Sequence, residues 1–311
     1  MGADLAAAPA AKGPLPLQPS EGPAHGSLGG GALSVKNSES LAPTPEGAAT
    51  PQADSARPPR VGLFATCLVD LFRPSIGFSA VKLLEKAGCE VHVPIAQTCC
   101  GQPAYNSGDR ADSRAIAEQV IEAFEAFDYV VAPSGSCAAM LRKHYPGLFS
   151  QDGDQQTGWA QRATAFSEKC FELISFLSDV MKVETTGETF KGTVTYHDSC
   201  SGLRELQIRD QPRKLLAGID GLAMTEMKDP DVCCGFGGTF CVKYAEISNA
   251  IVSKKVSSIE TTGADTLLAG DLGCLMNMAG KLKRSGSAME VRHVAEVLAG
   301  MTEQPPIAGR K

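Results

Sequence analysis

The sequence predicts an α/β fold made of two tandem repeats, each a small parallel sheet flanked by helices. Two observations lead to this prediction. Apolar segments alternate as strand, helix, strand, helix, strand in residues 60–150 and again in residues 191–300, an order that favours parallel strands joined by right-handed crossovers. In addition, four cysteines recur at matching places in both segments, offset by 133 to 137 residues. We therefore interpret the chain as an internal duplication.

The elements of each repeat follow from apolar periodicity and turn residues. In the first repeat we predict strands over residues 61–66, 89–94 and 129–132. Helices are predicted there over residues 78–86 and 112–127. In the second repeat we predict strands over residues 193–197, 222–227 and 266–269. Helices are predicted there over residues 204–217, 244–261, 276–283 and 291–298.

Three segments fall outside the repeats. Residues 1–59 are rich in Ala, Pro, Gly and Ser. Such a segment cannot bury enough apolar surface to offset the entropy of ordering it, so we predict a disordered tail. Residues 151–190 are interpreted as a helical connection, with a helix over residues 163–181. We expect residues 301–311 to form a flexible C-terminus.

Composition excludes several classes of function. The formal net charge is −6 and Lys and Arg are not clustered, which argues against nucleic-acid binding. No apolar run approaches the roughly 18 residues that suggest a membrane span, and we find no secretory signal. We therefore expect a soluble, cytoplasmic protein. Eleven cysteines in such a chain indicate metal binding or redox chemistry rather than a disulfide framework.

The most informative motif is Cys-Cys-Gly, which occurs at residues 99–101 and again at residues 233–235. Each copy has one cysteine about thirty residues before it and another about forty residues after it. All of these cysteines follow predicted strands, and loops at the carboxyl ends of parallel strands meet in one crevice. The candidate ligands are Cys67, Cys99, Cys100 and Cys137 in the first repeat, and Cys200, Cys233, Cys234 and Cys274 in the second.

Thiolate ligands suit zinc, copper(I) and iron–sulfur clusters. Structural zinc sites usually space paired cysteines two to four residues apart, and directly adjacent cysteines fit poorly around one tetrahedral ion. Four thiolates match the ligand requirement of a 4Fe–4S cluster. We therefore predict two 4Fe–4S clusters, one in each repeat. Zinc binding and metal-free thiol–disulfide chemistry are the alternatives.

The remaining cysteines have simpler interpretations. Cys89 starts a predicted strand and Cys170 lies on a predicted helix, so both are expected to be buried as small apolar side chains. Cys241 follows Cys234 by seven residues and has no counterpart in the first repeat. It is either a neighbour of the second site or a spare ligand.

Three polar residues lie close to the candidate ligands. His197 precedes Cys200 by three residues; it would hydrogen-bond a cluster sulfur, relay protons, or be satisfied by backbone. We expect Arg73 and Arg204 to be solvated, the alternative being that they stabilise a reduced cluster. The glycine-rich residues 235–240 end in Phe where the dinucleotide-binding pattern needs Gly, which argues against a nicotinamide or flavin site.

The duplicated cysteine pattern resembles the CCG domain of the heterodisulfide reductases. It also resembles the iron–sulfur subunits of glycolate oxidase and anaerobic glycerol-3-phosphate dehydrogenase. Residues 66–70, 97–108 and 231–240 are similar to the lactate utilization protein A family, and the resemblance covers about residues 60–300.

This resemblance implies a non-flavin iron–sulfur subunit that transfers electrons in a multi-protein system oxidising L-lactate to pyruvate. Its implied partners are a second iron–sulfur protein and a third subunit of that system. One departure concerns Ser134 and Asp271, which stand where the heterodisulfide reductase pattern has a fifth cysteine. The five-cysteine clusters therefore do not carry over, although Asp271 could supply an oxygen ligand. A heterodisulfide-type reductase subunit and a zinc-stabilised scaffold remain as alternatives.

Overall fold

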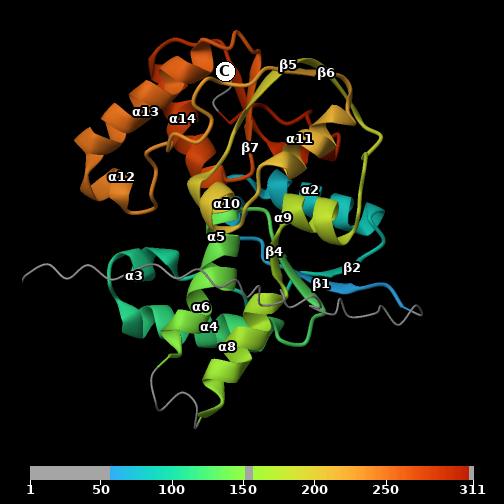
Figure 1. The fold of residues 1–311 in the computed structure, drawn as a ribbon, viewed down its shortest axis with the longest axis vertical. Coiled ribbons are helices and arrows are strands. Elements are labelled where there is room, and N and C mark those ends of the chain that lie inside the picture. The colour runs from blue at the N-terminus through green and yellow to red at the C-terminus, as the bar shows by residue number, and fades with distance from the viewer. Residues whose placement is uncertain (1–56, 151–156, 308–311) are drawn as a thin grey trace, which may run out of the picture. The chain divides into compact units, whose positions relative to one another are not determined.

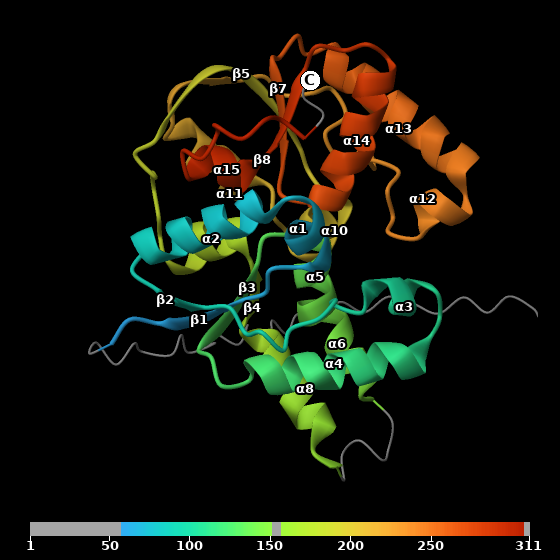
Figure 2. The same ribbon diagram turned by 180° about the vertical axis from the view of Figure 1, so that it is seen from behind.

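Two four-stranded parallel sheets form the framework of the protein, one in each half (Figures 1 and 2). We describe residues 57–150 and 157–307 of a computed structural model. The first sheet has the order β2-β1-β3-β4 and the second the order β6-β5-β7-β8. The strands are β1 (Arg60–Leu63), β2 (Glu90–His92), β3 (Tyr129–Ala132), β4 (Cys170–Glu172), β5 (Thr189–His197), β6 (Asp220–Met224), β7 (Thr266–Ala269) and β8 (Glu290–His293). The predicted fold class is confirmed.

Each sheet contains one point at which the strand order reverses. The chain passes from β1 outward to β2, then crosses back to β3 on the other side of β1, and β5, β6 and β7 repeat this path. All neighbouring strands are parallel. The loops that leave β1 and β3 therefore diverge at one edge, and those that leave β5 and β7 do the same. Such reversals are where open α/β sheets bind their ligands.

Helices connect the strands in both halves. The first half contains α1 (Cys67–Phe72), α2 (Pro74–Lys86), α3 (Gln102–Asn106), α4 (Arg110–Phe124), α5 (Gly135–Ala139), the π-helical turn η1 (Met140–His144), α6 (Tyr145–Leu148), α8 (Trp159–Glu168), α9 (Leu173–Ser175) and the π-helical turn η2 (Phe176–Val180). The second half contains α10 (Cys200–Glu205), α11 (Asp210–Ala217), α12 (Phe240–Lys243), α13 (Ala245–Glu260), α14 (Leu272–Arg284) and α15 (Val294–Leu298).

Two predicted helices were wrong in part, because each contains the fourth strand of a sheet. The helix predicted over residues 163–181 is divided into α8, β4, α9 and η2, and the helix predicted over residues 291–298 is β8 followed by α15. Within the segment 151–190, expected to be a helical connection, β4 completes the first sheet. Both strands are short and continue directly into a helix without a separating Gly or Pro, so periodicity alone does not reveal them.

The predicted helix over residues 204–217 is also divided, into α10 and α11. The break includes Gln207, whose φ is 59°, a conformation that ends a right-handed helix. Pro212 lies in the first turn of α11, where its missing N–H costs no intrahelical hydrogen bond. The disordered tail predicted for residues 1–59 lies outside the described residues except for residues 57–59, where Arg57 pairs with Asp128.

The main core is shared by the two halves, which belong to one compact unit. Side chains alternate across a strand, so neighbours on it face opposite sides of the sheet. Val131 of β3 and Leu268 of β7 both face this shared core, packed with Val61, Val194 and Val294. Helix α2 of the first half packs against α15 of the second.

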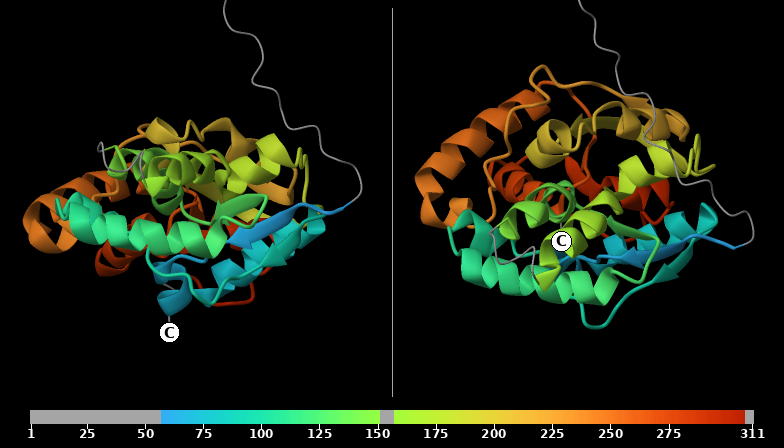
Figure 3. Two further views of the ribbon diagram at one scale, coloured as in Figure 1. Left: turned by 90° about the horizontal axis from the view of Figure 1, so that it is seen from below. Right: turned by 60° about the horizontal axis from the view of Figure 1, so that its bottom comes forward.

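The other face of each sheet has its own helical cover. Val130 of β3 packs with α4, and Leu267 of β7 packs with α13 and α14. Helices α4 (green) and α13 (orange) can be followed from two directions in Figure 3. Within the part of the chain described, no helix is both long enough and apolar enough to cross a membrane. At the end of the described chain, Arg73 and Arg292 donate hydrogen bonds to the carbonyl oxygens of Pro305 and Gln304.

Candidate metal centres

The first four predicted ligands come from three loops that follow β1, β2 and β3. Cys67 is the first residue of α1, Cys99 and Cys100 form the turn before α3, and Cys137 lies in the first turn of α5. Gly101 ends this turn with a φ of 82°, a left-handed conformation that glycine adopts without steric cost. The carboxyl edge of the first sheet thus presents all four thiols to one place.

Direct contacts link these four thiols. The sulfur atoms of Cys67 and Cys99 are 4.0 Å apart. Hydrogen bonds from Cys100 and Cys67 to the Cys99 sulfur lower the pKa of Cys99 to about 2. Contact with Cys99 raises the pKa of Cys67, and contact with Cys137 and then Cys99 raises the pKa of Cys100. The contacts favour the thiolate form of Cys99 beside its neighbouring thiols, and thiolates are soft metal ligands.

The second four predicted ligands repeat this arrangement. Cys200 begins α10, Cys233 and Cys234 follow β6, and Cys274 lies in the first turn of α14. Hydrogen bonds from Cys200 and Cys234 lower the pKa of Cys233 to about 2. The backbone N–H of Gly235 also donates to the Cys233 sulfur, at 3.3 Å. Cys234 and Cys274 are both buried.

The structure therefore brings together all eight predicted ligands, in two groups of four. The other three cysteines lie outside both groups. Cys89 and Cys170 are buried in apolar clusters as predicted, although Cys170 lies on β4 and not on a helix. The thiol of Cys241 donates to the carbonyl oxygen of Gly238 at 3.3 Å. That the two groups bind metal stays a prediction.

Ser134 and Asp271, at the places of the missing fifth cysteines, form a contact between the two halves. Each caps the helix that carries a ligand: Ser134 accepts from the N–H of Cys137, and Asp271 Oδ1 accepts from the N–H of Cys274. Asp271 Oδ2 accepts from the hydroxyl of Ser134 at 3.0 Å and from the N–H and hydroxyl of Ser136 at 3.0 and 2.7 Å. These donors fix the Asp271 carboxylate beside the Cys274 thiol, with which it also shares a hydrogen bond.

His197, at the end of β5, is a polar residue beside the second group. It is fully buried, and neither ring nitrogen has a hydrogen-bond partner among the described residues. One ring nitrogen and the sulfur atoms of Cys234 and Cys274 all lie within 4.8 Å of one another. Burial lowers the pKa of His197 to about 3, so the ring is neutral at pH 7. The predicted alternative of backbone hydrogen bonding was wrong.

Arg73 was expected to be solvated, and this was also wrong. Its guanidinium group is 2.8 Å from the carboxylate of Glu296, and the two side chains are 13% and 0% exposed. Arg204 fits the prediction better, because its guanidinium group donates to the backbone oxygen of Asp231 in an exposed contact. Arg73 and Arg204 each follow a candidate ligand in the sequence, and the sequence does not reveal which of the two pairs with a buried carboxylate in the other half.

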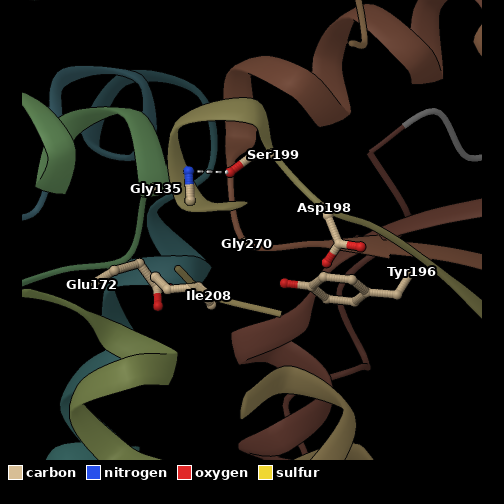
Figure 4. Close-up of a pocket in the computed structure, with 8 residues that line it drawn as sticks. Gly135, Glu172, Tyr196, Asp198, Ser199, Ile208 and Gly270 are labelled. Carbon is tan, nitrogen blue, oxygen red and sulfur yellow. Dashed lines mark hydrogen bonds between the residues drawn. The ribbon is translucent and has the colours of Figure 1, made fainter. Parts of the chain in front are cut away.

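A small polar cavity lies where the two halves meet, next to Ser134 and Asp271 in the chain: its lining includes Gly135 and Gly270 (Figure 4). Glu172 of β4 and Tyr196 of β5 approach it from different sides, and a Cβ on Gly270 would lie 3.3 Å from the Tyr196 hydroxyl and 3.5 Å from Glu172 Oε1. Glu172 Oε2 accepts from two backbone N–H groups, whereas Oε1 has no partner among the described residues. Burial raises the pKa of Glu172 to about 7.

Comparison with known proteins supports the same division of the chain. Residues 61–142 and 194–279 both match the cysteine-rich domain named CCG. Lactate utilization protein A of Geobacillus sp. (strain WCH70) is 48% identical over 239 residues, covering 77% of this chain and 98% of that protein. The protein of the same name from Bacillus subtilis (strain 168) is 47% identical with the same coverage. A crystal structure of a hypothetical protein from Helicobacter pylori shares the fold, with a TM-score of 0.54, 14% identity, and coverage of 82% of this chain and 50% of that one.

The fold and the two thiol groups define a protein with two tandem cysteine-rich domains. The relatives specify it further, because they match nearly their whole length. The chain belongs to the lactate utilization protein A family. The resemblance predicted from residues 66–70, 97–108 and 231–240 is thereby confirmed.

Proposed function

We propose that this protein is an iron–sulfur electron-transfer subunit of a multi-protein system that oxidises L-lactate to pyruvate. Two groups of four thiols at the sheet edges carry this proposal. The names of the relatives supply the link to lactate utilization. The partners would be a second iron–sulfur protein and a third subunit, and the assembly would be cytoplasmic.

The donor chemistry of both groups fits an iron–sulfur cluster. Each repeat would hold one 4Fe–4S cluster, which requires four thiolates and supplies one-electron transfer when bound. The first cluster would be held by Cys67, Cys99, Cys100 and Cys137, and the second by Cys200, Cys233, Cys234 and Cys274. The residues around them would set the reduction potential through burial and hydrogen bonds to sulfur, and the Gly235 N–H already donates such a hydrogen bond to Cys233.

A metal and sulfide analysis tests this proposal. Protein purified without oxygen should contain close to eight iron and eight sulfide per chain, and reduction should produce an electron paramagnetic resonance signal. Cys99→Ser and Cys233→Ser should each lower the iron content by about half and abolish lactate oxidation by the reconstituted complex. Cys89→Ser is the matched control, because Cys89 is buried outside both groups, and it should retain all the iron. Full activity of Cys99→Ser would contradict the proposal.

One distance favours a second candidate, a zinc-stabilised scaffold. The sulfur atoms of Cys67 and Cys99 are 4.0 Å apart. This is close to the separation of about 3.8 Å for two thiolates on one tetrahedral zinc with Zn–S bonds of about 2.3 Å. Zinc without sulfide in the purified protein would establish this scaffold and remove the electron-transfer proposal. A metal-free chain that reduces disulfides would instead indicate the reductase alternative, for which the low pKa of Cys99 is the supporting feature.

A further inference from the structure

The two repeats differ at one buried position beside the thiols. His197 precedes Cys200 by three residues, and Phe64 stands at the same distance before Cys67. Both are fully buried, and both lie at or just after the strand that leads to the first ligand of their repeat. The duplication therefore provides an internal comparison in which one site has an imidazole and the other has a phenyl ring.

His197 differs from the other histidines that the structure describes. His92 and His144 contact Glu90 and Glu205 through a ring nitrogen, and His293 accepts a hydrogen bond from a backbone N–H. His197 alone among them has no hydrogen bond at either nitrogen. Because buried polar groups are normally paired, such a group needs an explanation.

Nearby side chains do not provide the missing partner. Lys255 is also buried close to the second group, but its ammonium donates to the backbone oxygens of Asp229 and Pro230, each at 2.8 Å. The sulfurs of Cys234 and Cys274 lie within 4.8 Å of a His197 nitrogen. Imidazole nitrogen and thiolate sulfur both bind iron and zinc.

We propose that His197 is a direct nitrogen ligand of the metal centre in the second repeat, where it takes the place of one of the four thiols in a four-ligand set that includes Cys234 and Cys274. The first centre has Phe64 in that place and so takes sulfur ligands alone. The two centres of one chain are therefore chemically unequal. This inference rests on the proposed function, because it requires metal at the second thiol group.

Histidine-specific isotope labelling tests the ligand directly. The full-length chain is purified without oxygen after growth with ¹⁵N-histidine, and pulsed electron paramagnetic resonance of the reduced protein then detects any nitrogen bound to the metal. We expect a histidine nitrogen coupling in the wild type and its loss in His197→Phe. The coupling should persist in Cys99→Ser, which lacks the first centre, and in the control His293→Phe.

The first centre serves as the folding control within the same chain. His197→Phe should keep the signal of that centre, so loss of the nitrogen coupling cannot be attributed to unfolding. If the variant loses both centres, the labelled Cys99→Ser protein decides the question alone. Iron and sulfide in normal amount, with no histidine coupling in the wild type, would overturn the inference and leave the proposed function intact.

Zinc in place of iron in the purified protein would overturn the electron-transfer proposal but would still allow the assignment of His197 as a ligand to be tested. In such a protein, loss of one zinc per chain in His197→Phe would still support His197 as a ligand. Retention of both zinc ions would overturn that assignment.

Discussion

Removal of Arg73 should destabilise the protein strongly, because it would leave a buried carboxylate in the other half without its charged partner. Arg73 Nε is 2.8 Å from Glu296 Oε1, and Glu296 is fully buried. The same oxygen accepts from the Ser75 hydroxyl at 2.6 Å, and Oε2 accepts from the N–H of His293 at 3.1 Å. In Arg73→Met the carboxylate would retain only these two neutral donors.

The expected loss follows from the burial of both groups. Breaking a buried ion pair by removal of one partner costs about 3–5 kcal/mol. Arg73 is 13% exposed, so water can partly replace it, and we expect the lower end, about 3 kcal/mol. Because domains are usually stable by about 5–15 kcal/mol, this is a large fraction of the free energy of unfolding.

Urea denaturation of the metal-loaded protein measures this effect. Arg73→Met should shift the midpoint to lower urea, and Arg73→Met/Glu296→Gln should recover part of the loss, because glutamine leaves no charge and can still accept a hydrogen bond. Arg204→Met is the matched control and should cost less than about 0.5 kcal/mol, as an exposed substitution. A loss below about 1 kcal/mol in Arg73→Met, or no recovery in the double variant, would refute the reasoning.

Three further predictions concern the residues around the two thiol groups. The pKa of Glu172 is raised to about 7 in the folded protein, above that of the unfolded chain. The unfolded chain therefore loses this proton first as pH rises, and stability should fall by about 1.4 kcal/mol per pH unit between about pH 4.5 and 7. Glu172→Gln should flatten this slope in thermal unfolding followed against pH; an unchanged slope would count against the buried carboxyl. Asp271→Ala removes a helix cap and a carboxylate shared by both halves, and should lower the free energy of unfolding by about 2–4 kcal/mol; wild-type stability would argue against this contact. Gly235→Ala should lower the free energy of unfolding more than Gly88→Ala. Both glycines have a positive φ, but only a Cβ at Gly235 would meet a backbone oxygen, that of Ser248 at 2.8 Å. Equal melting temperatures would show that this close approach has no effect.

The sequence by itself determined the duplication, the fold class and the membership of the two thiol groups. These features depend on local patterns: strands β3 and β7 are apolar segments bounded by turn residues, and their bounds agree with prediction. The placement of the cysteines follows from topology alone. Parallel strands end at the same edge, so thiols far apart in sequence, such as Cys67 and Cys137, must approach one another once the strands pair.

Only the tertiary structure decided what surrounds those thiols. Strands β4 and β8 are three and four residues long, and they are strands because a sheet edge is available for pairing, not because their sequence excludes a helix. The ion pair of Arg73 with Glu296 and the contact of Ser134 with Asp271 join residues of different halves, and no local pattern encodes such a pairing. The lack of a hydrogen-bond partner at His197 likewise depends on how the groups around its ring are packed. Periodicity determines which face of an element is buried, whereas burial against a particular partner is fixed only when the two halves pack together.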